Sequence, residues 1–194
     1  MQDFIFYIKL GLNHVLDFSA YDHILFLAAL ALPFGFKSWK KVVLLATVFT
    51  ITHCISLFLS VYKIAVIDVS LIEFLIPVTI FETAVFNLIY VKSETQHKSI
   101  LLHMIATAFF GLVHGFGFSN YFNMLMAEQE EKIMPLFGFA TGIEISQVII
   151  VLTVLALTYL LTTLVKLKSS LVVVIGSILI LIITIPMLIE TFPR

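Results

Sequence analysis

The sequence lacks most of what water-soluble and secreted proteins carry. Only 12% of its 194 residues are charged, and its single cysteine, Cys54, excludes an intramolecular disulfide. The formal net charge is −1, so no basic surface is available for nucleic acid. The start, MQDFIFYIKL, has no basic segment and no small-residue cleavage site, so we expect no cleaved signal peptide.

The amount of apolar sequence indicates a membrane protein. Hydrophobic residues make up 61% of the chain, against roughly half in soluble domains. So short a chain cannot bury this excess in one water-soluble core. About 20 apolar residues cross a bilayer as a helix. Six segments reach or approach that length: Asp22–Phe36, Val42–Val61, Val69–Val91, Ile100–Phe122, Met134–Val165 and Ser170–Ile189.

These segments predict an all-α membrane protein, a single bundle of six to seven transmembrane helices. Residues 1–18 contain a further apolar stretch, Phe4–Phe18, interrupted by polar and small residues. It is a seventh span, a re-entrant segment or an interfacial helix. The connections are short, so residues 1–194 form one transmembrane domain whose partner is the lipid bilayer. A homo-oligomer is left open.

Lysines predict the orientation of the bundle, because cytoplasmic loops are enriched in basic residues. Three loops on one side carry Lys37, Lys40, Lys41, Lys92, Lys98, Lys166 and Lys168. The opposite side carries Lys63, Lys132 and Arg194. We therefore expect the first side to be cytoplasmic and the C-terminus to be external, in the inner membrane of a bacterium. If Phe4–Phe18 spans fully, the N-terminus is cytoplasmic.

Two stretches one hundred positions apart suggest an internal repeat. GLNHVLDFSAY at Gly11–Tyr21 and GLVHGFGFSNY at Gly111–Tyr121 share their Gly, Leu, His, Phe, Ser and Tyr residues. A weaker echo pairs Thr50–His53 with Thr141–Glu144. Two similar halves around a central site are common among transporters. Chance similarity between apolar segments is the alternative.

The ionisable residues within the apolar segments are almost all histidines or carboxylates. A charge in hydrocarbon costs at least ~2.5–3.5 kcal/mol, so such residues pair, line a cavity or bind something. Lysine and arginine are nearly absent at these depths, so the carboxylates must be protonated, paired with imidazole or balanced by a cation. The residues concerned are His14, Asp17, Asp22, His23, His53, Glu73, Glu82, His114 and Glu144.

Depth along the helices predicts a site in the outer half of the bundle. In the predicted orientation, the residues from His14 to His23 lie near the external face, and His114 lies near the external end of its span. His53 and Glu144 are deeper, and Glu82 is near mid-membrane. Imidazole and carboxylate donors together suit nickel, cobalt, zinc or iron(II).

Local spacing suggests how these donors act, and each has a simpler explanation. His14 and Asp17 share a face if their segment is helical. Asp22 and His23 are adjacent, so one of them can bind an ion while the other orients the side chain that binds it. The alternative for the N-terminal residues and for Glu73 is that they are polar residues at the membrane interface. The alternative for His53 is a hydrogen bond to a neighbouring helix, and for His114 it is glycine packing with an incidental histidine. The many phenylalanines are expected to face lipid.

Four runs resemble the HupE/UreJ family in order along the chain. They are G-x-x-H…D-H-I-L-F-L (Gly11–Leu27), F-T-x-x-H-x-x-S (Phe49–Ser56), F-G-L-x-H-G-F-G-F (Phe110–Phe118) and G-F-x-x-G-I-E-x-x-Q (Gly138–Gln147). The family consists of small membrane proteins linked with hydrogenase and urease accessory functions and regarded as nickel or cobalt permeases.

The resemblance implies a set of functional residues. By their place in the matching runs, the metal ligands are His14, Asp22, His23, His53, His114 and Glu144. Asp17, Glu73 and Glu82 are secondary candidates because they are ionisable groups in or beside apolar segments. The best-known nickel permeases of the family carry His-Pro ahead of the Asp-His pair, whereas Val15 follows His14 here. That difference is typical of a divergent branch of the family. The resemblance therefore supports binding or transport of a metal ion more strongly than it supports nickel as that ion.

Three functions fit these residues. The first is a permease for a divalent transition-metal ion, with nickel first and cobalt, zinc or iron as alternatives. The second is an intramembrane metal-dependent hydrolase, in which the histidines at 14, 23, 53 and 114 would supply the ligands and Glu144 the general base. The absence of a His-Glu-x-x-His motif counts against it, and its catalytic residues are unknown. The third is an accessory membrane subunit with a static metal site. Against the permease, few polar residues lie inward of Glu82, namely Thr83, Asn87 and Thr107.

Overall fold

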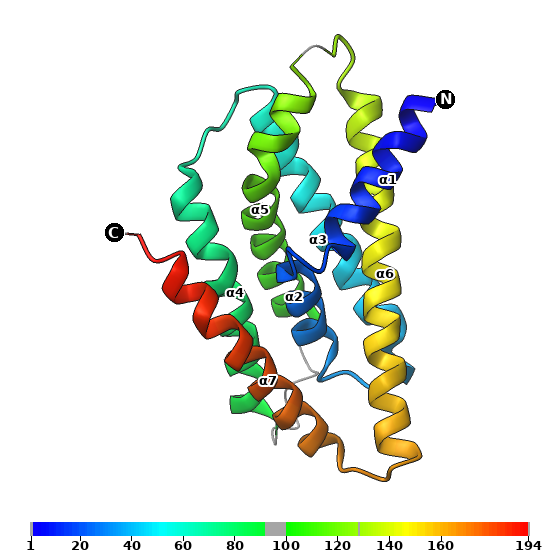
Figure 1. The fold of residues 1–194 in the computed structure, drawn as a ribbon. Coiled ribbons are helices and arrows are strands. Elements are labelled where there is room, and N and C mark those ends of the chain that lie inside the picture. Colours follow the sequence, from blue (N-terminus) through cyan, green and yellow to red (C-terminus); the bar gives the residue numbers. More distant parts are fainter. Residues whose placement is uncertain (1, 92–99, 128, 194) are drawn as a thin grey trace.

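The fold is a bundle of seven α-helices within the residues that the computed structural model describes, 2–91, 100–127 and 129–193 (Figure 1). The helices are α1 (Gln2–Leu16), α2 (Asp22–Ala31), α3 (Trp39–Val61), α4 (Val69–Tyr90), α5 (Ile100–Leu125), α6 (Ile133–Thr163) and α7 (Ser169–Glu190). Lys92, Lys98 and Arg194, which contribute to the predicted orientation, lie outside the described residues.

The length and composition of the helices confirm an all-α membrane protein. Four of them, α3, α4, α6 and α7, are long and apolar enough to cross a bilayer. A fifth, α5, has 26 residues and is therefore about 39 Å long at 1.5 Å per residue. From α2 onward, consecutive helices alternate in direction, so the loops between them collect at the two ends of the bundle (Figure 1).

The first crossing is made by two helices instead of one. With 15 and 10 residues, α1 and α2 are about 22 and 15 Å long, and each is shorter than the ~30 Å of hydrocarbon. In Figure 1, α1 runs inward from the end of the bundle that holds the N-terminus, and α2 continues toward the opposite end. Together the two helices extend along the bundle as one longer helix would, and the N-terminus lies at the same end as the loops after α3 and α5.

A local turn explains the break between α1 and α2. The Asp17 carboxylate accepts a hydrogen bond from the Ser19 amide at 2.8 Å, and the Asp17 carbonyl accepts one from the Ala20 amide at 3.2 Å. Such side-chain bonds compete with helix formation. The predicted segment Asp22–Phe36 is also too long, because α2 ends at Ala31 and a turn with Pro33 follows it.

Glycines bring two helix pairs into close contact. On α1, a Cβ added to Gly11 would lie 3.1 Å from the Cα of Gly142 on α6. On α5, Gly111 and Gly115 face the backbone of α3 at Phe49 and His53 in the same way. In Figure 1, α1 and α6 run in one direction, whereas α3 and α5 run in the other. Of the predicted repeat, the stretch Gly11–Tyr21 begins in the pair α1 and α6, and the stretch Gly111–Tyr121 begins in the oppositely directed pair α3 and α5.

A larger residue at one of these contacts should separate the helices. In Gly142→Ala, the new Cβ would collide with the backbone oxygen of Ile8 and lie 2.8 Å from the Leu12 nitrogen. We expect a loss of about 1–3 kcal/mol, measured as a lower thermal midpoint of the detergent-purified protein. Gly35→Ala is the matched control, because no atom lies within 4 Å of its added Cβ. Equal midpoints for the two variants would contradict close packing of α1 on α6.

Candidate functional site

Four histidines from four helices converge inside the bundle. His14 comes from the last turn of α1, His23 from the first turn of α2, His53 from α3 and His114 from α5. One ring nitrogen from each of His14, His23 and His53 can be chosen so that all three lie within 4.8 Å of one another. The ring centre of His114 is 5.1 Å from that of His23. We call these four residues the histidine cluster.

The cluster presents nitrogen atoms that the protein does not satisfy. The Nε2 atoms of all four histidines are buried and have no hydrogen-bond partner, and neither does Nδ1 of His53. An unsatisfied buried polar group costs about 1–3 kcal/mol, and native proteins contain few of them. Neutral imidazoles bind transition metals through such nitrogens. The arrangement is therefore suited to hold a cation among the four rings.

Hydrogen bonds on the far side of two rings point the free nitrogens inward. Nδ1 of His23 lies 3.2 Å from Oδ1 of Asp22, which also accepts the His23 amide at 2.9 Å. Nδ1 of His114 lies 2.9 Å from the carbonyl oxygen of Phe110. A proton on Nδ1 in each ring leaves the Nε2 lone pair for a metal ion, and partners of this kind fix the orientation of metal-binding histidines. Asp22 also supplies a negative charge next to the cluster.

The cluster lies deeper than the sequence analysis placed it. Eight residues separate His53 from the end of α3 at Val61, and eleven separate His114 from the end of α5 at Leu125. These intervals correspond to about 12 and 16 Å. His14 is about 18 Å from the start of α1 by the same measure. The expectation that His14, Asp22 and His23 lie near the external face is therefore wrong, because α1 carries them to the middle of the bundle.

Glu144 is held apart from the histidine nitrogens. Its two carboxylate oxygens accept hydrogen bonds from the Thr47 and Thr50 hydroxyls of α3, each at 2.6 Å. The Thr50 hydroxyl also lies 3.2 Å from Oε1 of Gln147. Charge-assisted bonds of this length are strong, so Glu144 joins α6 to α3 about one turn away from His53.

The secondary candidates are dispersed. Asp17 is exposed in the turn after α1, and its carboxylate is bound to Ser19. It therefore does not share a helix face with His14, because α1 ends at Leu16. Glu73 is exposed in the first two turns of α4, and Glu82 borders a separate cavity between α2, α4 and α5.

Phenylalanine rings cover the histidine cluster on both sides along the bundle. Phe26, Phe49 and Phe110 form the inner phenylalanine layer, with the Phe26 ring centre 5.1 Å from that of Phe49 and 5.3 Å from that of Phe110. Each lies three or four residues along its helix from a histidine, away from the end that holds the N-terminus. Helical geometry places residues at this spacing on the same face.

The outer phenylalanine layer lies on the side toward the N-terminus and consists of Phe118, Phe122 and Phe139. The rings of Phe118 and Phe139 stack with centres 5.2 Å apart, and Phe118 is 3.9 Å from His14. Phe122 and Phe139 are fully buried, as are Phe26 and Phe49. The expectation that phenylalanines face lipid is thus wrong for these residues. The i, i+4 spacing of Phe49 with His53 and of Phe110 with His114 is the sequence signal that predicts this arrangement.

The whole described chain matches one known family. A family model described as HupE / UreJ protein matches residues 1–191. No curated protein and no solved structure matches the chain.

The unsatisfied nitrogens predict an unusual effect of substitution on stability. His53→Leu removes two buried nitrogens without partners and keeps a side chain of similar size. We expect the metal-free variant to be more stable than the wild type by about 1–2 kcal/mol, measured by thermal unfolding in detergent with a chelator present. Thr153→Val is the control, because Thr153 is exposed and bonded to its own helix. A less stable His53→Leu protein would mean that other groups satisfy these nitrogens.

Proposed function

The chain belongs to the HupE/UreJ family, and from this premise we propose that it is a permease that carries a divalent transition-metal ion across a membrane. Nickel is the first candidate cargo, and cobalt, zinc and iron(II) suit the same imidazole and carboxylate donors. In this proposal the metal ion is a substrate that binds and leaves. The proposed location is the inner membrane of a bacterium, with the C-terminus external.

The observation that carries the proposal is the set of four buried Nε2 atoms without partners. A bound ion would replace the hydrogen bonds that these nitrogens lack, and Asp22 would offset part of its charge. Because the four ligands come from α1, α2, α3 and α5, small movements between these helices can take the site apart. A site of this kind can release its ion, which a permease requires.

The phenylalanine layers support a carried ion in preference to a hydrolase. A metallohydrolase keeps one coordination position open to its substrate and has a carboxylate base close to the metal-bound water. Here the rings of the two layers cover the cluster, and both oxygens of Glu144 are already bonded to Thr47 and Thr50. The arrangement fits an occluded state, in which an ion has no path to either side until one layer opens.

The membrane potential supplies enough energy for transport in the proposed orientation. Moving one elementary charge through 100 mV is worth about 2.3 kcal/mol, so a divalent cation gains about 4.6 kcal/mol. That gain corresponds to a concentration ratio of more than a thousandfold. Uptake of a scarce metal ion therefore does not require ATP.

Metal uptake into proteoliposomes tests the proposal. We expect the wild-type protein to take up nickel or cobalt under an inside-negative potential, and His53→Ala and His114→Ala to lose uptake and stoichiometric binding together. Metal in the vesicles and in the detergent-purified protein is measured by mass spectrometry. Thr153→Val should behave as the wild type. Metal that binds tightly without uptake would instead indicate a static site, and no binding of any ion would remove the metal site altogether.

Asp22→Asn separates the role of orientation from that of ligation. The variant keeps all four histidines but weakens the bond that orients His23 and removes the adjacent negative charge. We expect metal affinity to fall about 10–100-fold, as for other residues that orient metal-binding histidines, measured by titration of the purified protein. An unchanged affinity would mean that Asp22 does not act on His23.

A further inference from the structure

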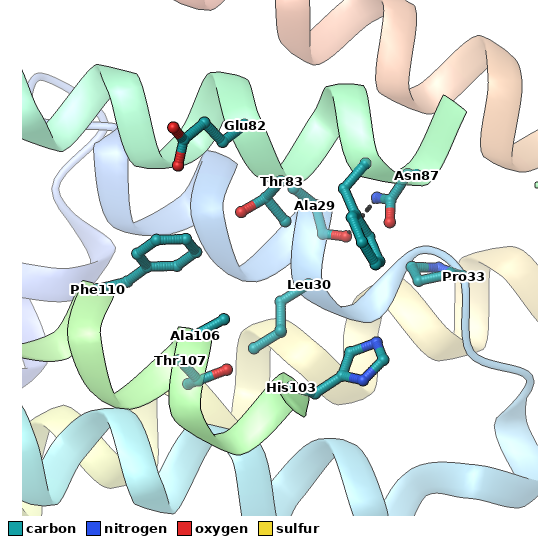
Figure 2. A pocket seen from close by; sticks show the side chains of 11 residues that line it. Ala29, Leu30, Pro33, Glu82, Thr83, Asn87, His103, Ala106, Thr107 and Phe110 are labelled. Carbon is teal, nitrogen blue, oxygen red and sulfur yellow. Dashed lines mark hydrogen bonds between the residues drawn. The ribbon is translucent and has the colours of Figure 1, made fainter. Parts of the chain in front are cut away.

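A cavity with several polar side chains in a mainly apolar wall lies on the other side of the inner phenylalanine layer. It is a cavity of about 230 Å³ between α2, α4 and α5. Figure 2 shows its lining, in which Thr83 of α4 lies on one side of the cavity and His103 and Thr107 of α5 lie on the other, among apolar side chains. The polar residues are Glu82, Thr83, Asn87, His103 and Thr107. Of these, Thr83, Asn87 and Thr107 are the few polar residues expected inward of Glu82, whereas His103 is not among the residues predicted to have a function.

The cavity and the histidine cluster share a wall. The ring of Phe110 belongs to the inner phenylalanine layer and also lines the cavity. The carbonyl oxygen of the same residue binds Nδ1 of His114. Thr107 precedes His114 by seven residues on α5, a rise of about 10 Å. Rotation of the Phe110 side chain would therefore open a short path between the two spaces.

Thr107 is the strongest sign that the cavity holds a polar occupant. Its side chain is 1% exposed, and its hydroxyl has no hydrogen-bond partner. Other buried threonines of the bundle donate to the carbonyl four residues earlier on their own helix, as Thr158 and Thr184 do. A hydroxyl without such a bond and facing a cavity is suited to bind water or an ion.

Glu82 makes an apolar occupant costly. It lies in the fourteenth position of the 22-residue helix α4 and is exposed beside the cavity. A carboxylate at this depth must be hydrated, protonated or balanced by a cation. The volume is sufficient for a hydrated ion, because six waters at about 30 Å³ each occupy about 180 Å³.

We propose that this cavity is a water-filled chamber that receives the hydrated metal ion on the inner side of the phenylalanine layer, with Glu82 and Thr107 binding its water shell. The inference rests on the proposed permease function and gives the ion a second station after the histidine cluster. The cavity also brings Thr83, Asn87 and Thr107 together, so these residues form the inward polar path that a permease requires. Asn87 is held in place by its bond to the carbonyl of Ala29 at 2.8 Å.

Cysteine labelling tests whether the chamber holds water. Cys54 is the only native cysteine, so Thr83→Cys is made in a Cys54→Ala background that retains metal uptake. A charged, membrane-impermeant thiosulfonate added from one side should modify Thr83→Cys, and nickel or cobalt alone should slow the reaction. Thr153→Cys, on the exposed face of α6, is the lipid-facing control. Reaction of Thr83→Cys only with an apolar maleimide, as for the control, would show a lipid-filled pocket and overturn the inference.

Transport measurements separate this inference from the function on which it rests. We expect Glu82→Gln and Thr107→Val to lower metal uptake about tenfold or more, while stoichiometric metal binding at the histidine cluster stays unchanged. Glu190→Gln, at the exposed end of α7, is the matched carboxylate control and should transport normally. Wild-type uptake with unaltered uptake by both cavity variants would refute the chamber alone. An absence of wild-type uptake would refute the permease.

Discussion

Four buried imidazole nitrogens that have no hydrogen-bond partner determine how the helices are arranged in the middle of this bundle. In hydrocarbon a polar group cannot turn to solvent, and the helix backbone has no bonds to spare. The Nε2 atoms of His14, His23, His53 and His114 are nevertheless buried and unpaired, and ring nitrogens of the first three lie within 4.8 Å of one another. Asp22 and the Phe110 carbonyl fix two of the rings. The break in the first crossing, the close helix pairs and the aromatic layers all serve to hold these nitrogens together and dry.

The discontinuous crossing is what allows one segment to supply two ligands. His14 and His23 are nine residues apart, and on a continuous helix they would be separated by about 13.5 Å along its axis. The turn that begins at Asp17 brings their ring centres to 4.7 Å. Glycine contributes on the other helices, because Gly115 lets α5 approach the His53 backbone on α3. A side chain there would push His114 away from the cluster.

Hydropathy predicts most of this fold, and local chemistry predicts much of the site, because both signals are short-range. The long spans follow from apolar runs, and the histidines follow from the cost of polar groups in lipid. The depth of His14 was mispredicted because hydropathy does not distinguish a turn inside the bundle, such as the one that Asp17 and Ser19 form, from a loop at its end. The separation of Glu144 from the histidines depends on the rotation of α6 against α3, which a helix period alone does not fix. His103 could not be predicted as a cavity residue, because its place in the cavity depends on α4 lying opposite α5.

The opposite directions of the two glycine-packed pairs bear on how such a bundle can move. One pair, α1 with α6, points away from the N-terminal end, and the other, α3 with α5, points toward it (Figure 1). Oppositely directed structural repeats can exchange conformations about an axis in the membrane plane. In such an exchange, the state open to one face is related to the state open to the other by rotation about that axis, so the two states would have similar energies. In the proposed permease, a small membrane potential or metal gradient would then be enough to favour one of the two conformations over the other.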